Sequence, residues 1–395
     1  MLSVFRSDMQ EYFGISLSQF GLLLSIGTLP GVFGSLLGGR LVDRVGPRTV
    51  MRVCLVGTAL GMILVSLAET WGFMLLSLCV LALFGPTLSI ATHAYLVRLF
   101  PNRRRRVLAI SMVVVSVMGG CFSLLAEGLV QLHRHSEDVS FAAILHAPFA
   151  ISAGILLVGS FVYARRRSRE RADSQDMAVD AQRLDHLKPG NMLLVALLIT
   201  HTIFDVAANT WMPRVLDSCS FSEVVFKPGY VMFGFSSAYV VSRSLLSLMG
   251  ERRGRRIMMV APSFLGAAAL TAGVLSRSQA TLSICYVLAG FLWSVEYPVI
   301  LAILAEQSGP RFGSAMAMQM VGMGIGTFAA TNLMGLLGQH LGEANLWKIL
   351  LVPACGLPLV GIGGAVWIWR FGRDLSAPGI DVQEKIVLAE EVSEE

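Results

Sequence analysis

Charged residues are scarce in this chain: Asp, Glu, Lys and Arg make up 14% of its 395 residues, whereas hydrophobic residues make up 54% and the mean hydropathy is +0.67. A soluble globular protein is excluded, because its surface needs far more charge. The six cysteines show no paired spacing and five fall in apolar segments, which argues against a disulfide or metal framework. No long apolar stretch follows a basic start at the N-terminus, so no cleavable signal peptide is expected.

Catalytic clusters are also missing from the sequence. The polar residues inside the apolar segments form neither a nucleophile–base pair nor a metal-ligand cluster, so we expect no enzyme activity and no cofactor. The formal net charge of +5 does not indicate nucleic acid binding, because the basic residues alternate from loop to loop. No nucleic acid partner is therefore expected.

Long apolar runs dominate what is present. Crossing the ~30 Å hydrocarbon core takes about 20 residues of helix. No run shows the period-2 alternation of a barrel strand, so we expect an all-α integral membrane fold. Eleven runs have the required length: residues 20–38, 50–68, 72–97, 107–131, 147–163, 191–212, 229–249, 257–275, 281–304, 313–337 and 348–369.

Arginines mark every second connection between these runs. The arginine-rich loops lie near residues 40–48, 98–106, 165–171 and 252–256, and the loops between them carry few basic residues. This positive-inside pattern predicts a multi-pass protein of the cell membrane, with the arginine-rich loops and the C-terminus in the cytoplasm. Residues 371–395 are rich in Asp and Glu and are expected to form an acidic, solvated cytoplasmic tail.

The chain also repeats itself. The loop GGRLVDRVGPR matches SLMGERRGRR, which aligns Asp43 with Glu251 at a distance of 208 residues. The segment RRVLAISMVVVSVMGG matches RFGSAMAMQMVGMGIG, which aligns Arg105 with Arg311 at a distance of 206 residues. Two independent matches at nearly the same spacing indicate two equivalent halves. We expect an N-terminal bundle over residues 1–163, a cytoplasmic linker over 164–190, a C-terminal bundle over 191–370 and the tail over 371–395.

The first of these loops resembles a known signature. The pattern G-x-x-x-D-R-x-G-x-R, formed by Gly39, Asp43, Arg44, Gly46 and Arg48, is similar to the signature loop of the major facilitator superfamily. The resemblance covers essentially the whole chain. It implies two pseudo-symmetric bundles of six helices, a cytoplasmic linker, a central cavity for a small-molecule solute, and alternating access. The expected partners are this solute and the lipid bilayer, and we expect a monomer.

This resemblance leaves one helix unaccounted for. The repeat places the partner of residues 191–212 about sixteen residues before Met1, so we expect the first of the twelve helices to be missing apart from MLSVF. The visible helices would then be numbers 2–6 and 7–12 in family order. A misassigned start codon explains this more simply than a genuine eleven-helix protein.

The signature loops contain candidate gate residues. A carboxylate at Asp43 or Glu251 would cap the free N–H groups of a helix start and meet the positive end of its dipole. The resemblance places Asp43 near the helix start at Gly313 and Glu251 near the start at Val107, with contacts that exist only while the cytoplasmic side is closed. The second loop contributes Arg252, Gly254 and Arg255 to the same gate motif. The alternative is that these charges only set the topology.

Polar residues inside the span 191–212 are candidate substrate or proton groups. His201, Asp205 and Asn209 recur every four residues and so share one helix face. The segment from Asp205 to Trp211, followed by Met-Pro, is similar to a sequence pattern in the same helix of fucose permease-like members of the superfamily. In those members the acidic residue of the pattern is associated with binding of polar substrate or protons. The alternative is that Asp205 pairs structurally with His201.

Two further ionisable residues lie in later spans. Glu296 lies two residues before Pro298, whose missing N–H loosens a helix. Glu296 is therefore a candidate proton or substrate site. The alternative is a carboxylate whose hydrogen bonds are satisfied at the edge of the cavity. Arg243 either holds an anionic substrate or anchors a cytoplasmic network.

The preferred function is secondary active transport of a small polar solute, a sugar or an organic acid, with protons as the candidate coupling ion. Two features of drug and proton antiporters are missing, namely a Gly-Pro pair in the fifth helix and an Arg in the middle of the fourth. The alternatives are an efflux transporter of amphipathic compounds and a truncated non-functional or sensor derivative.

Overall fold

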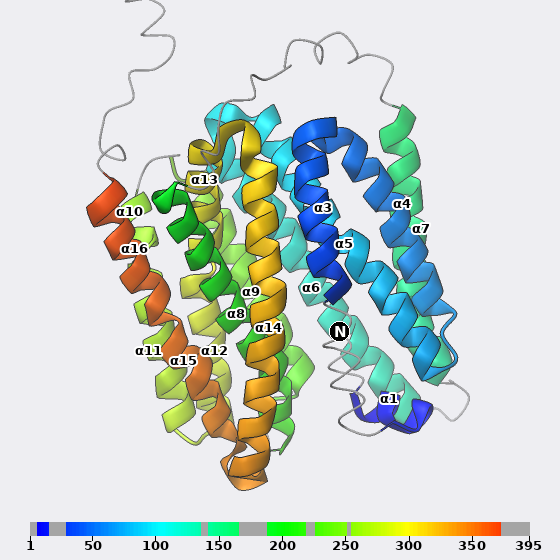
Figure 1. Ribbon diagram of the computed structural model, residues 1–395. Coiled ribbons are helices and arrows are strands. Elements are labelled where there is room, and N and C mark those ends of the chain that lie inside the picture. The colour runs from blue at the N-terminus through cyan, green and yellow to red at the C-terminus, as the bar shows by residue number, and fades with distance from the viewer. Residues whose placement is uncertain are drawn as a thin grey trace, which may run out of the picture.

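The computed structural model describes residues 6–15, 29–135, 141–165, 188–218, 226–250 and 254–372. This part of the chain is helical, and no strand occurs in it. Figure 1 shows the long helices running between the same two ends of the molecule. The all-α membrane fold expected from the apolar runs is confirmed.

The first part of the chain forms the helices on one side of Figure 1. They are α1 Arg6–Phe13, α3 Leu29–Val45, α4 Pro47–Ser66, α5 Trp71–Leu99, the short 3-10 helix η1 Pro101–Arg103, α6 Arg104–His135 and α7 Phe141–Arg165. We call these helices the first half.

The second part of the chain forms the helices on the other side. They are α8 Pro189–Ser218, α9 Pro228–Leu248, α10 Arg255–Met258, α11 Ala261–Leu275, α12 Gln279–Trp293, α13 Glu296–Ser308, the 3-10 helix η4 Gly309–Arg311, α14 Phe312–Leu341, the 3-10 helix η5 Glu343–Leu350, α15 Leu351–Gly356 and α16 Pro358–Phe371. We call these helices the second half.

Each predicted apolar run falls on one of these helices or on two or three consecutive ones. Within the described residues, nine helical segments are long and apolar enough to cross a membrane, and α7 contains a shorter apolar stretch, Ile144–Ser160. The first run was predicted at residues 20–38, but α3 spans Leu29–Val45, and residues 20–28 lie outside the described part. The expected remnant MLSVF lies outside it as well.

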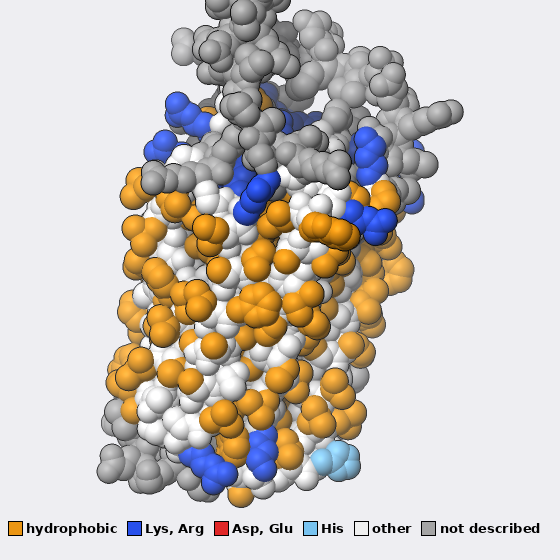
Figure 2. All heavy atoms as spheres, turned by 90° about the vertical axis from the view of Figure 1, so that its left-hand side faces the viewer, with side chains coloured by type: hydrophobic (Ala, Val, Ile, Leu, Met, Phe, Trp, Pro, Cys, Tyr) orange, Lys and Arg blue, Asp and Glu red, His pale blue; other side chains and the backbone are white. Residues whose placement is uncertain are grey.

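The outer surface of the helices is apolar. Figure 2 shows hydrophobic side chains covering the length of one face, with Lys and Arg gathered at its two ends. Large apolar residues such as Val158, Ile284 and Trp369 are exposed over more than half of their area. Side chains of this kind are stable on the outside only when the surrounding solvent is hydrocarbon.

Among the residues that the structure describes, the buried apolar core shared by the two halves lies at one end. The largest buried apolar cluster joins Val42 and Leu108 of the first half to Ile300 and Phe312 of the second. These residues lie beside the arginine-containing connections, so we call this the arginine-rich end. Elsewhere the buried apolar residues divide into one cluster for each half. The structure is therefore closed between the halves at the arginine-rich end.

Two helix pairs carry most of the packing between the halves, α3 with α14 and α6 with α9. In the sequence repeat, α3 corresponds to α9 and α6 corresponds to α14, so exchanging the halves converts one pair into the other. Gly39 permits the closest approach of the first pair. A Cβ atom at Gly39 would lie 2.3 Å from the Ala317 Cβ and 2.8 Å from the Gly313 carbonyl oxygen.

Gly39→Ala is therefore expected to lower thermal stability. The added methyl group has to push α3 away from α14, and overpacking of this kind costs about 1 to 3 kcal/mol. Gly85→Ala in α5 is the matched control, because a Cβ atom there meets nothing within 4 Å. Thermal unfolding in detergent should show a lower midpoint for Gly39→Ala and an unchanged or higher one for Gly85→Ala. Equal midpoints for the two variants would contradict the packing described.

Candidate functional site

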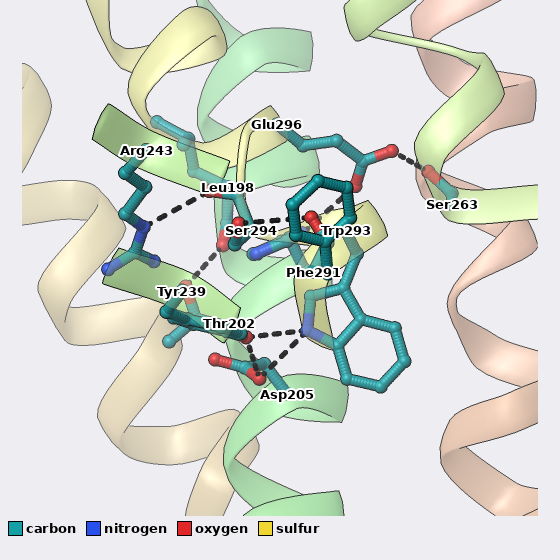
Figure 3. Close-up of polar contacts among 11 residues, drawn as sticks. Leu198, Thr202, Asp205, Tyr239, Arg243, Ser263, Phe291, Trp293, Ser294 and Glu296 are labelled. Carbon is teal, nitrogen blue, oxygen red and sulfur yellow. Dashed lines mark hydrogen bonds and ion pairs between the residues drawn. The ribbon is translucent and has the colours of Figure 1, made fainter. Parts of the chain in front are cut away.

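A carboxylate near the middle of α8 lies where three helices meet. Asp205 Oδ1 accepts hydrogen bonds from the Tyr239 hydroxyl of α9 at 2.5 Å and from the Trp293 indole of α12 at 3.2 Å. The same indole N–H also lies 2.5 Å from the Tyr239 hydroxyl oxygen. Figure 3 shows Trp293 pointing toward Asp205. Asp205 is half-buried, and the two donors hold its carboxylate in place. No cation of the described part of the chain makes a hydrogen bond to it.

The Asp205 network continues one turn along α8. Asn209 donates through Nδ2 to Asp205 Oδ1 at 3.0 Å and accepts from the Tyr286 hydroxyl at 2.9 Å. Phe235 stacks on Tyr286 with ring centroids 4.4 Å apart. The four-residue spacing thus brings Asp205 and Asn209 into contact, and aromatic side chains enclose both.

His201 belongs to a different cluster. Its Nδ1 lies 3.0 Å from Glu296 Oε2, and Ser263 of α11 donates to the other oxygen of Glu296. Both members of the pair are buried, with His201 2% and Glu296 0% exposed. The alternative in which Asp205 pairs with His201 is wrong, because the start of α13 brings Glu296 against the same turn of α8. Glu296 is likewise not at a cavity edge but fully enclosed.

The two clusters lie on either side of a helix break. The run predicted as one span at residues 281–304 is divided into α12 and α13, with a turn at Ser294 and Val295. Pro298 has no N–H to donate to the Ser294 carbonyl, so the helix is interrupted there. Trp293, just before the break, reaches Asp205, while Glu296, just after it, reaches Ser263 (Figure 3). Glu296 also contacts His201.

Arg243 of α9 lies beside this break and is 6% exposed. Its Nε donates to the Ser294 carbonyl at 3.2 Å, and its Nη1 donates to Ser116 Oγ of α6 at 2.8 Å. The guanidinium also lies 4.4 Å from the centroid of the Tyr239 ring. Arg243 thus contacts the Asp205 network, the broken helix and the first half together.

Trp211 stands apart from the Asp205 network. It faces α14 near Gly335, where a Cβ atom would lie 3.6 Å from its ring. The Arg214 guanidinium lies 5.7 Å from its ring centroid, and within the described residues its indole N–H has no acceptor. The structure therefore does not bring Trp211 to Asp205.

Asp43 sits at the start of α14, across the boundary between the halves. Its Oδ1 accepts from the Gly313 N–H at 3.1 Å and its Oδ2 from the Ser314 N–H at 2.8 Å. The Ser314 hydroxyl donates to the same oxygen. Arg98 lies 3.8 Å from Asp43 Oδ1. The carboxylate caps free N–H groups at the positive end of the helix dipole.

The rest of the first signature loop shapes the turn between α3 and α4. Gly46 has a φ of +92°, a conformation that residues with a side chain rarely adopt. Arg48 lies with its guanidinium 5.2 Å from the centroid of the Tyr95 ring, whereas Arg44 is exposed.

The second signature loop is only partly described, and Glu251 and Arg252 lie outside the described residues. Gly254 has a φ of +71°, and Arg255 forms a two-point ion pair with Glu306 of α13, at 2.6 and 2.8 Å. Next to this loop, Arg105 of the first half donates to the Met249 carbonyl at 2.9 Å and to the Gly250 carbonyl. A cation thus holds the C-terminal end of α9.

The chain matches the Major Facilitator Superfamily over residues 1–234 and 220–385. It belongs to that superfamily. The fold is similar to that of the transporter FucP in its outward conformation, with a TM-score of 0.68 and 14% identity over 92% of this chain and 93% of the other. It is also similar to the proton:xylose symporter XylE bound to 6-bromo-6-deoxy-D-glucose, with a TM-score of 0.68 and 12% identity over 94% and 91%.

A crystal structure of the E. coli fucose:proton symporter FucP, in a single-substitution form, gives a TM-score of 0.66 and 14% identity over 92% of this chain and 94% of the other. No curated protein sequence matches the chain. At this identity the structural similarities establish the fold. Membership of the Major Facilitator Superfamily makes the protein a transporter of the lipid bilayer rather than an enzyme.

Several polar residues of this superfamily member were missed from the sequence. Residue type alone does not distinguish three of them from ordinary aromatic residues of apolar spans: Tyr239, Tyr286 and Trp293. Ser263 likewise resembles a small residue that only packs between helices. The position of Tyr239, four residues before Arg243, was an available signal, because residues at this spacing share a helix face.

Glu296→Gln is expected to lower the thermal stability of this transporter while leaving its uptake measurable. The amide keeps the shape of the side chain, but a carboxylate hydrogen bond to the buried His201 is lost, at a cost of about 1 to 3 kcal/mol. Glu69→Gln is the matched control, since Glu69 is exposed in the loop between α4 and α5, where a substitution usually changes stability by less than about 0.5 kcal/mol. Thermal unfolding should rank Glu296→Gln below Glu69→Gln. The reverse order would contradict a structural role for Glu296.

Proposed function

We propose that the protein is a secondary active transporter of a small polar solute, a sugar or an organic acid, that works by alternating access and is coupled to protons. The observation that carries the proposal is the Asp205 network. An ionisable carboxylate surrounded by hydroxyl, amide and indole groups inside a membrane bundle is costly, and such groups mark substrate or proton pathways.

Asp205 is a better candidate for the proton-binding group than Glu296. Glu296 is fully enclosed and both of its oxygens are engaged by His201 and Ser263 of its own half. Asp205 is only half-buried, and its Oδ1 takes all of the hydrogen bonds described for the carboxylate. The charged and titratable groups around Asp205 are Arg243 and Tyr239 from α9 and Tyr286 from α12.

Polar chemistry around Asp205 favours a polar solute. Hydroxyl and amide groups of Tyr239, Tyr286 and Asn209 can exchange hydrogen bonds with a hydroxylated ligand, and aromatic faces suit the apolar face of a sugar. The printed descriptions of FucP and XylE are those of fucose:proton and proton:xylose symporters, which supports the same class here. We therefore propose that Asn209 assists from α8, with Asp205 as the group that contacts solute or proton.

The halves are proposed to rock as two units, residues 1–163 and 191–370, joined by the linker 164–190. The exchange of packing partners between α3–α14 and α6–α9 supports this division. The positive-inside pattern supports a cytoplasmic position for the arginine-rich end, in the cell membrane, with the tail over 371–395 on the same side. The gate motif would then close the cytoplasmic side, and the working unit is proposed to be the monomer.

Uptake by purified protein in proteoliposomes tests the proposal. Radiolabelled hexoses, pentoses and monocarboxylates are compared with an amphipathic cation, each with and without an inward proton gradient. We expect accumulation of at least one hydroxylated or carboxylated solute that depends on the gradient. Transport of the amphipathic cation alone, in the outward direction, would replace the proposal with drug efflux.

A further inference from the structure

One backbone carbonyl is released where α12 ends and α13 begins. The carbonyl of Ser294 would normally accept from the N–H of residue 298, but that residue is Pro298. The released carbonyl accepts from Arg243 Nε at 3.2 Å instead. The neighbouring Ser242 donates through its hydroxyl to the Phe291 carbonyl at 2.6 Å. Two consecutive residues of α9 therefore hold the broken helix in its present shape.

The same guanidinium crosses to the first half. Arg243 Nη1 donates to Ser116 Oγ at 2.8 Å and to the Met112 carbonyl at 3.3 Å, both on α6. Ser116 in turn donates to that carbonyl at 2.9 Å, so the hydroxyl is oriented with its lone pairs toward Arg243. This contact lies within the α6–α9 pair that joins the halves. A movement of one half against the other has to change it.

The charge of Arg243 is balanced indirectly. Within the described residues its guanidinium makes no ion pair, although it is almost fully buried. It lies against the Tyr239 ring, and the hydroxyl of Tyr239 donates to Asp205 at 2.5 Å. The carboxylate of Asp205 attracts the guanidinium of Arg243 across this ring. Tyr286 and Tyr297 are the titratable residues that face Asp205 and Arg243 from other helices. In a medium of low dielectric constant this attraction is strong.

We propose that Arg243 is the positioning residue that couples the state of Asp205 to the contact between the halves. While Asp205 is ionised, the guanidinium is held between Tyr239, Ser294 and Ser116, and the halves stay closed at the arginine-rich end. A proton on Asp205 removes the balancing charge. Arg243 then turns toward other acceptors, its bonds to Ser116 and Ser294 weaken, and the halves are released to rock. This mechanism rests on the proposed role of Asp205 as the proton-binding group.

Distances between the halves test the coupling without any transport measurement. Spin labels are placed at Leu99 and Ile257, exposed residues of the two halves at the arginine-rich end, in a variant with the native cysteines replaced. A label pair at Val45 and Leu99, within the first half, is the matched control. In this labelled background, Asp205→Asn should raise the ratio of open to closed distances by about tenfold, which corresponds to the loss of one charged hydrogen bond. The distances of the control pair should not change.

The decisive comparison combines two changes. In an Arg243→Gln background, adding Asp205→Asn should alter the distance ratio by less than about twofold, because the group that senses the charge is gone. Arg243→Lys, which keeps the charge, should restore part of the response. Ser116→Ala, which is expected to fold normally, should reduce it. A tenfold response that persists in Arg243→Gln and in Ser116→Ala would overturn the proposal, whatever the result of uptake measurements.

Discussion

Asp205→Asn is expected to abolish solute uptake driven by a proton gradient. Asparagine keeps the shape of the side chain and can still accept hydrogen bonds from Tyr239 and Trp293, so folding is retained. It cannot bind or release a proton. We expect uptake to fall by at least about tenfold, equivalent to about 1.4 kcal/mol, with no remaining dependence on external pH.

Uptake is measured against pH in the parent protein and the variant, reconstituted at equal density. Asp217→Asn, at the exposed end of the same helix, controls for a general effect of removing an acid from α8. Thermal unfolding of each variant establishes that the fold is intact. A well-folded Asp205→Asn protein with the parental pH profile would remove Asp205 from the mechanism and leave Glu296 as the remaining carboxylate candidate.

Asp43→Ala is expected to shift the protein away from the state closed at the arginine-rich end. The substitution leaves the N–H groups of Gly313 and Ser314 without their acceptor and removes a negative charge from the positive end of α14. Loss of such a cap costs roughly 1 to 2 kcal/mol, which corresponds to a factor of about 5 to 30 between the two conformations. These hydrogen bonds exist only while α3 lies against α14, so the whole cost falls on the closed state.

The spin-label pair at Leu99 and Ile257, in the variant with the native cysteines replaced, measures this shift, because these exposed residues belong to different halves at the arginine-rich end. The ratio of open to closed distances should rise by a similar factor in Asp43→Ala. Arg44→Gln provides the control, since Arg44 belongs to the same loop but is exposed. Equal distance ratios in Asp43→Ala and the parent protein would show that Asp43 only sets topology.

The helices were largely predictable from the sequence because apolar length is a direct consequence of the thickness of the bilayer. The positions at which these helices are interrupted were harder to predict. The run at residues 281–304 satisfies the length requirement as one span, and Pro298 indicated a weak point without showing that Trp293 and Glu296 would serve two different clusters. That division depends on which helices pack on each side of the break, and no local pattern contains this information.

The hydrogen-bond partners of the polar residues in α8 also could not be predicted from local sequence patterns. Four-residue spacing rotates a side chain by about 40° at each step, so His201 and Asn209 differ by about 80° around α8. His201 therefore faces α13 while Asn209 faces α12, although the sequence places both on one broad face with Asp205. Asp43 was located more successfully, because its expected partner at Gly313 followed from a resemblance between whole loops rather than from spacing on one helix.

Proton movement during uptake tests the central claim most directly. Proteoliposomes are suspended in weakly buffered medium with a pH electrode, and the solute identified by the uptake screen is added without an imposed gradient. The account predicts that the medium becomes more alkaline as solute enters, at a fixed ratio of protons to solute, and that Asp205→Asn shows no such change. Solute entry in the parent protein without proton movement would contradict it.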